Sequence, residues 1–213
     1  MIVMIPIMSR FLSCVIFVTM LTRLHVAEAR DSSCPGQCRC LWKSSKITVE
    51  CTGVGAKGIP ENIDIGTQVL NMSDNNLSVM TQDMFARAKL LNLQKINVGY
   101  NNITEIHTRT FSDLLNLVDI DLSHNKLTTV PSHAFPQTLS LMILSLSHNP
   151  ISVVKSDAFT HLRHLTKLDL SNCQINTIQT GAFHNLPSLE RLYLESNRLR
   201  SKIQTGFSRT DIC

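Results

Sequence analysis

Apolar and polar residues recur in a fixed frame through most of the chain. In one copy of the frame, apolar residues stand at Leu93, Ile96, Val98 and Ile103, and an asparagine, Asn101, precedes the last of them. Six copies follow one another, with starts at Thr67, Leu93, Leu117, Leu141, Leu165 and Leu189. The first copy runs two residues longer than the 24-residue spacing of the later ones. Residues 67–213 therefore predict six repeats of one structural unit, of which the last is incomplete.

The alternation inside the frame predicts a short strand at the start of each unit. Alternate residues on a strand point to opposite faces, so the leucine-type residues point inward and the intervening residues point outward. The asparagine turns the chain, and its amide can bond buried backbone groups. A looser, partly helical return leads to the next strand. The frame L-x-x-L-x-L-x-x-N-x-L is that of a leucine-rich repeat. It predicts an α/β solenoid, a horseshoe with a parallel concave β-sheet.

The phenylalanines provide an independent check of this period. Two of the eight lie in the first 20 residues, and the other six each fall 18 residues after the start of their repeat: Phe85, Phe111, Phe135, Phe159, Phe183 and Phe207. Residues at one position of a stacked repeat form one row. We therefore expect these rings to stack as a buried spine inside the solenoid.

Residues 1–29 predict a secretory signal peptide. Arg10 precedes a largely apolar run, residues 11–21, and the small-residue site Ala27-Glu28-Ala29 follows. The run is too short to span a bilayer, which needs roughly 20 apolar residues. The composition is 43% hydrophobic and 17% charged, with a net charge of +4. It excludes a disordered chain and a polytopic membrane protein, and the charge is too small to indicate nucleic-acid binding.

Four cysteines crowd into the segment that precedes the repeats. Cys34, Cys38, Cys40 and Cys51 predict two disulfides in a secreted chain, because a zinc site would favour C-x2-C pairs. Four cysteines allow three pairings, and their spacing does not choose among them. Residues 34–66 also hold the only tryptophan and a hairpin around Lys43-Ser44-Ser45-Lys46, so they predict a cap on the first repeat.

The other two cysteines of the mature chain lie far from this cap. Cys173 takes the asparagine position of the fifth repeat, so we expect a buried, reduced thiol. Cys213 has no visible partner, which predicts disulfide-linked dimers. In the last repeat, Lys202 and Thr210 replace apolar residues. Because a terminal repeat without a polar cap exposes core, we expect the sequence to be a fragment or a truncated product.

The cap residues CPGQCRCLWKS, at 34–44, resemble the N-terminal cap of the insect Kekkon proteins. Residues 66–70 and 90–95 are similar to the first repeats of that family. The resemblance implies the disulfides Cys34–Cys40 and Cys38–Cys51. It also implies binding to cell-surface receptors or ligands of growth-factor pathways. Kekkon proteins continue into an immunoglobulin domain and a membrane helix, so membrane attachment is expected only if the parent chain continues past Cys213.

The outward strand residues form rows across the concave face and are candidates for a protein-binding site. An apolar centre with a polar rim is typical of an interface hot spot. The middle of the face carries apolar residues flanked by tyrosines and acids. The candidate binding residues are Tyr100, Val118, Asp119, Asp121, Met142, Ile143, Asp169 and Tyr193.

Other chemistry is sparse. Asn71, Asn76 and Asn102 each begin an N-x-S/T glycosylation motif. Asn76 and Asn102 share one repeat position, so two glycans there would crowd. His124 and His148 should stack on adjacent repeats, where metal binding or pH sensing is the functional interpretation and ordinary repeat filler the simpler one. We find no nucleophile–base arrangement, phosphate loop or metal-ligand spacing, so neither catalysis nor a cofactor is expected.

These patterns together predict a non-enzymatic extracellular protein that binds other proteins. Its partner would be a receptor ectodomain or another extracellular protein, with a role in growth-factor signalling or cell–cell recognition. The alternative is a structural component of the extracellular matrix, like the small leucine-rich proteoglycans, which share a four-cysteine cap. An innate-recognition ectodomain is a third interpretation, although such ectodomains usually carry more repeats.

Overall fold

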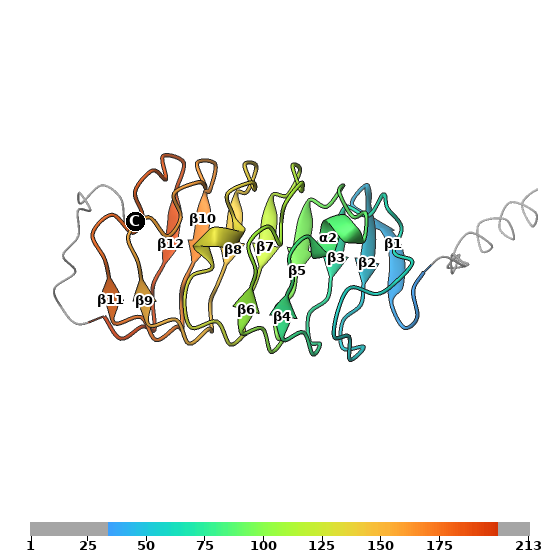
Figure 1. Cartoon of the computed structure of the whole chain (residues 1–213), viewed down its shortest axis with the longest axis horizontal. Helices are drawn as coiled ribbons and strands as arrows, with labels where there is room; N and C mark the ends of the chain where they lie inside the picture. The colour runs from blue at the N-terminus through green and yellow to red at the C-terminus, as the bar shows by residue number, and fades with distance from the viewer. Residues whose placement is uncertain (1–33, 200–213) are drawn as a thin grey trace, which may run out of the picture. The chain divides into compact units, whose positions relative to one another are not determined.

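The structure, a computed structural model, describes residues 34–199 (Figure 1). One sheet of eight strands runs the length of this region, in the order β1-β2-β3-β5-β7-β8-β10-β12. Its strands are β1 (Arg39–Lys43), β2 (Lys46–Glu50), β3 (Val69–Asn71), β5 (Lys95–Asn97), β7 (Asp119–Asp121), β8 (Ile143–Ser145), β10 (Lys167–Asp169) and β12 (Arg191–Tyr193). The signal peptide expected at 1–29, Phe207 and Cys213 lie outside the described residues.

Successive repeats pair in parallel and in register. Ile96 of β5 lies opposite Ile120 of β7, which lies opposite Leu144 of β8, and Leu168 of β10 continues the row. All four side chains are fully buried. Because the register places residues with the same repeat position side by side, every position of the frame becomes a row across the sheet. The predicted solenoid with a parallel sheet is confirmed.

The phenylalanines are buried as predicted where the structure describes them, and their rings stack in two groups, Phe85 with Phe111 and Phe135, and Phe159 with Phe183. Phe85, Phe111, Phe135, Phe159 and Phe183 are all buried. The rings of Phe85 and Phe111 stack with centroids 5.9 Å apart, and so do those of Phe111 and Phe135. Phe159 and Phe183 stack at 5.8 Å. The spine fills the space between the sheet and the returning loops.

The repeated asparagines bond neighbouring coils to one another. The Nδ2 group of Asn125 donates to the carbonyl of Val98 in the preceding repeat, at 2.9 Å, and its Oδ1 accepts from the amide of Ile103, at 3.0 Å. Cys173 takes this position in the fifth repeat and donates from Sγ to the carbonyl of Leu146, at 3.4 Å. Its thiol is buried and free, as predicted, and burial raises its pKa.

The return segments contain less helix than the sequence led us to expect. Within residues 34–199 they hold one helical turn, α2 (Met84–Arg87), one 3-10 turn at Ser132–Ala134, and two small parallel sheets. The sheets pair β4 (Val79–Met80) with β6 (Glu105–Ile106), and β9 (Val153–Val154) with β11 (Thr177–Ile178). Left-handed residues at Asp83 and Lys89 bracket α2, so the helix cannot extend beyond one turn.

The cap is a disulfide-bonded hairpin laid against the first repeat. Ser44 and Ser45 both have positive φ, which is the backbone of a two-residue hairpin turn between β1 and β2. Disulfides join Cys34 to Cys40 and Cys38 to Cys51, which is the pairing that the Kekkon resemblance implied. β2 then pairs in parallel with β3, so the cap continues the sheet of the repeats. Residues 34–199 contain no helix with the length and hydrophobicity that spanning a bilayer would require.

Candidate protein-interaction surface

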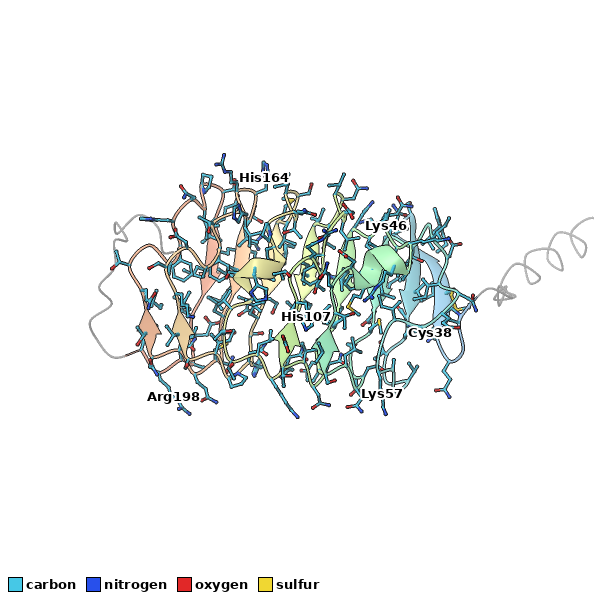
Figure 2. The ribbon with its side chains drawn as sticks, viewed as in Figure 1. Cys38, Lys46, Lys57, His107, His164 and Arg198 are labelled. Atoms are coloured by element: carbon cyan, nitrogen blue, oxygen red, sulfur yellow. A yellow bond between two sulfur atoms is a disulfide. The ribbon has the colours of Figure 1, made fainter. Side chains whose placement is uncertain are left out.

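An open hollow of about 730 Å³ lies where the loops enter the strands of the third to sixth repeats. Val118 and Met142 line it side by side, since the amide of Met142 donates to the carbonyl of Val118. His164, Thr166 and Glu190 provide polar lining, and Figure 2 shows His164 at the loop edge above the sheet. The structure therefore brings together two of the predicted apolar residues and places polar groups around them.

Ile143 and Asp119 are neighbours in register on adjacent strands. Ile143 is half-buried, and Lys167 lies on its other side in β10. The carboxylate of Asp119 forms an ion pair with Lys95, at 2.7 Å. Because Lys95 neutralises the charge of Asp119, burying Asp119 in an interface costs less free energy than burying an unpaired carboxylate.

The two other acids of the predicted site shape the turns that follow their strands. Oδ1 of Asp121 accepts from the amide of Ser123, and Oδ1 of Asp169 accepts from the amide of Ser171, both at 2.9 Å. Asp169 also accepts from the hydroxyl of Ser171, at 2.7 Å. Both acids have a structural role beside any binding role, which the sequence analysis missed. An acid two residues before a serine at a strand end is the signal that would have indicated it.

Tyr193 lies at the downstream end of the described sheet, in β12 beside Asp169 of β10. The ammonium group of Lys167 stands 5.2 Å from the centroid of its ring. A cation at this distance holds the ring face in place. Tyr193 is therefore a partly exposed aromatic side chain with a restricted orientation.

Tyr100 lies at the opposite edge of the sheet from Val118 and Met142. Its ring stacks on that of His124, and His124 stacks on His148, with both centroid distances 3.9 Å. All three residues have positive φ and occupy the turn position just before the repeated asparagine. The predicted histidine stack is confirmed, and Tyr100 belongs to it. Burial, followed by the neighbouring charge of His148, lowers the pKa of His124, while Asp121 acts in the opposite direction.

A row of exposed apolar side chains follows the loops that enter the strands. It consists of Ile65, Leu91, Leu115 and Leu139. Each lies two residues before the start of a repeat, which is the signal that the sequence analysis overlooked. The loops are held in place by bonds between coils, such as that from the hydroxyl of Ser140 to the carbonyl of Leu115, at 2.8 Å.

The three glycosylation motifs lie in the first two repeats. Asn71 ends β3, and its Oδ1 accepts from the amide of Ser73, at 3.0 Å. Asn76 and Asn102 are hydrogen-bonded to each other, with Nδ2 of Asn102 donating to Oδ1 of Asn76 at 3.0 Å. Among residues 34–199, no three His, Cys, Asp or Glu side chains are grouped in a way that could hold a metal ion.

Comparison with known sequences gives the family of the repeats. The family model described as leucine rich repeat matches residues 91–138 and 139–199, together just over half of the chain. Tsukushi of Gallus gallus is 31% identical over 102 residues, which are 45% of this chain and 27% of Tsukushi. Leucine-rich repeat-containing G-protein coupled receptor 5A of Xenopus laevis is 30% identical over 106 residues, 50% of this chain and 12% of the receptor.

Leucine-rich repeat-containing protein 3 of Homo sapiens is 32% identical over 91 residues, 43% of this chain and 33% of that protein. The chain thus spans a third or less of the length of these curated relatives. The similarity therefore concerns the repeat region that they share with this chain.

Proposed function

Because the chain belongs to the leucine-rich-repeat family, we propose that it is a non-enzymatic extracellular module that binds a protein partner on its concave sheet. The observation that carries this proposal is the hollow beside Val118 and Met142, where the 42% exposed methionine shares an apolar lining with Val118 and Leu189 and polar groups line the rest. An apolar anchor inside a polar rim is the arrangement of an interface hot spot. The two cap disulfides support an extracellular location, because such bonds persist in oxidising compartments.

The dimensions of the sheet favour a protein over a small ligand. Strands about 5 Å apart place the six repeat strands across roughly 25–30 Å, which suits a protein interface of standard size. The hollow is open rather than enclosed, whereas sites for small molecules bury most of their ligand. Ile143, Asp169 and Tyr193 extend the binding surface from the hollow along the sheet, and Tyr100 and Asp121 form its far edge.

We further propose a partner among the ectodomains of growth-factor receptors or their ligands, with a role in signalling or cell–cell recognition. The Kekkon-like sequence of residues 34–44 supports this proposal, and so does the similarity to a protein named as a receptor. The alternative, a structural matrix protein, predicts binding to fibrillar collagen instead.

Binding of the purified chain to a panel of receptor ectodomains and to fibrillar collagen tests these proposals. Met142→Asp should lower the affinity for the partner at least tenfold, because it places a charge in the apolar centre. Tyr193→Ala should lower it less. Thr177→Asp adds the same charge in β11, outside the main sheet, and should leave binding unchanged. Unchanged affinity of Met142→Asp would reject the concave site, and binding to collagen alone would favour the matrix role.

We also propose that Asn71, Asn76 and Asn102 carry N-linked glycans, with incomplete occupancy at the last two. The 3.0 Å bond between the side chains of Asn76 and Asn102 leaves little room for two glycans. Asn76→Gln should therefore raise the occupancy of Asn102, as measured by mass spectrometry of the secreted chain. Full occupancy of both sites in the unmodified sequence would contradict the crowding argument.

A further inference from the structure

Strand β1 is the outermost strand of the main sheet at the cap end. It pairs with β2 on one side, and no other strand in the described part of the chain pairs with its other side. Lys43 and Lys46 close a two-residue loop, so they form a hydrogen-bonded pair, and such pairs alternate along an antiparallel ladder. The backbone amides and carbonyls of Cys40 and Trp42 consequently point away from β2, toward solvent.

An unusual side chain lies on this edge. Trp42 is 72% exposed, more than any other large apolar side chain in residues 34–199, and it is the only tryptophan of the protein. A tryptophan exposed to this extent costs free energy in water and is over-represented among the anchors of interfaces. Trp42 lies opposite Ile47 in the hairpin, so its side chain is on the same face of the sheet as the side chains that enter the core.

The edge is held rigidly before any partner arrives. Cys40, the second residue of β1, is bonded to Cys34, and Cys38, just before the strand, is bonded to Cys51 after β2. The hairpin turn adds two residues with fixed left-handed backbone, Ser44 and Ser45. A preordered strand loses little conformational entropy on binding, which favours association with an extended peptide.

The charge along this edge is positive. Arg39 and Lys43 lie in β1, and Lys46 is the first residue of β2, directly after the hairpin turn and opposite Lys43. Glu50 is the acid of β2, and it already faces Lys43, at 3.6 Å. Asp64, in the loop before the first repeat, accepts from the amide of Gly66, at 2.6 Å. A second copy of this chain would bring like charges together along the strand, whereas an acidic segment would complement them.

We propose that the outer edge of β1 binds an extended, acidic segment of a partner protein by strand addition. The segment pairs with the outward backbone groups of Cys40 and Trp42, packs an apolar side chain against the indole, and presents carboxylates to Arg39 and Lys46. Five residues of β1 offer an edge of about 17 Å, which matches a segment of five or six residues. This surface is separate from the concave site, so either can fail without the other.

The single tryptophan makes this proposal directly measurable. The full chain, secreted from a eukaryotic host, is titrated with an octapeptide of alternating glutamate and valine while the emission of Trp42 is recorded. We expect a saturable blue shift as the indole leaves water. The same peptide N-methylated at alternate residues keeps its side chains but lacks the pairing donors, and should bind at least about tenfold more weakly. A lysine–valine octapeptide should produce no shift.

Variants separate specific binding from general charge attraction. Lys46→Glu should weaken binding of the glutamate–valine peptide about tenfold, as measured by calorimetry. Lys57→Glu, which reverses the same charge elsewhere in the cap, should change it less than twofold; Figure 2 shows Lys46 and Lys57 at opposite edges of the cap. Equal weakening by both variants, equal binding of the N-methylated peptide, or dimerisation that buries Trp42 without peptide would each overturn the proposal.

Discussion

The cap and the repeats are parts of one sheet, yet they are stabilised in different ways. In the repeats, buried rows such as Ile96, Ile120 and Leu144 pass from one coil to the next without any covalent link. In the cap, two disulfides join residues that lie only 6 and 13 positions apart in the sequence. An inner repeat has a neighbour on each side to complete its core, whereas within residues 34–199 the cap pairs with a repeat only on its inner side. Covalent bonds replace the missing contacts.

The boundary between the two regions shows that the cap imitates a repeat where it meets one. Asn75, the first repeated asparagine, donates from Nδ2 to the carbonyl of Cys51, at 2.6 Å. Its Oδ1 accepts from the amides of Val54 and Ala56, at 3.1 and 2.9 Å. The same amide geometry links the later repeats, so the cap presents a repeat-like inner side and a different outer side.

The largest effect should follow from breaking the continuous core of the repeats. Phe111→Ala removes a fully buried ring that stacks on both Phe85 and Phe135. We expect a loss of about 3–5 kcal/mol in the free energy of unfolding, measured by denaturant titration. Phe183→Ala, nearer the downstream end and 9% exposed, should cost less. Equal losses would show that position along the spine does not matter.

Removing a cap disulfide tests the other half of the comparison. The double variant Cys38→Ala/Cys51→Ala should lower the free energy of unfolding by about 3 kcal/mol. Cys34→Ala/Cys40→Ala should lower it by about 2 kcal/mol, because the Cys38–Cys51 bond closes the longer loop. Hydrogen exchange should show that the backbone amides of β1 and β2 lose protection first, while those of β8 and β10 remain protected. Uniform loss of protection along the sheet would mean that the repeats depend on the cap for their stability.

A reciprocal exchange at the asparagine position sharpens the role of the links between coils. Asn125→Cys removes the acceptor for the amide of Ile103 and should cost about 1–3 kcal/mol. The thiol of Cys173 is only a weak acceptor for the amide of Ile151. Cys173→Asn adds the amide oxygen that the other repeats have, and should stabilise the chain by about 1 kcal/mol. The two melting temperatures should shift in opposite directions. A destabilised Cys173→Asn variant would show that the fifth repeat has adapted to the smaller side chain.

The period of the sequence was enough to predict the sheet, the inward rows and the phenylalanine spine. A row depends only on spacing, so Phe85 and Phe111 could be aligned before their contacts were known. The hollow beside Met142 could not be predicted in this way, because it depends on how the loops around His164 and Glu190 are arranged. By contrast, the place of Tyr100 at the far edge could have been predicted from spacing, because Tyr100 shares the position just before the repeated asparagine with His124 and His148.

The regularity that stacks phenylalanines also stacks imidazoles, and there it should make stability depend on pH. His124 lies 3.9 Å from the rings of both Tyr100 and His148. Its pKa in the folded chain is lowered from the ordinary 6.5, first by burial and then by the charge of His148, against the opposing effect of Asp121. The unfolded chain therefore takes up this proton at a higher pH than the folded chain does.

Stability contributed by the neutral imidazole is consequently complete above pH 6.5 and is lost as the pH falls below that value toward the folded pKa. His124→Gln should remove this loss, so its melting temperature relative to the unmodified chain should be higher at about pH 5.5 than at about pH 7.5. His161→Gln, at an exposed position, is the matched control and should show no such trend. This change in stability should be smaller than those predicted for the phenylalanine, cysteine and asparagine variants, because His124 is only partly buried. If the melting temperature of His124→Gln differed from that of the unmodified chain by the same amount at both pH values, stacking in this row would carry no electrostatic cost. In that case only the apolar rows of the repeats would depend on the residues in neighbouring coils.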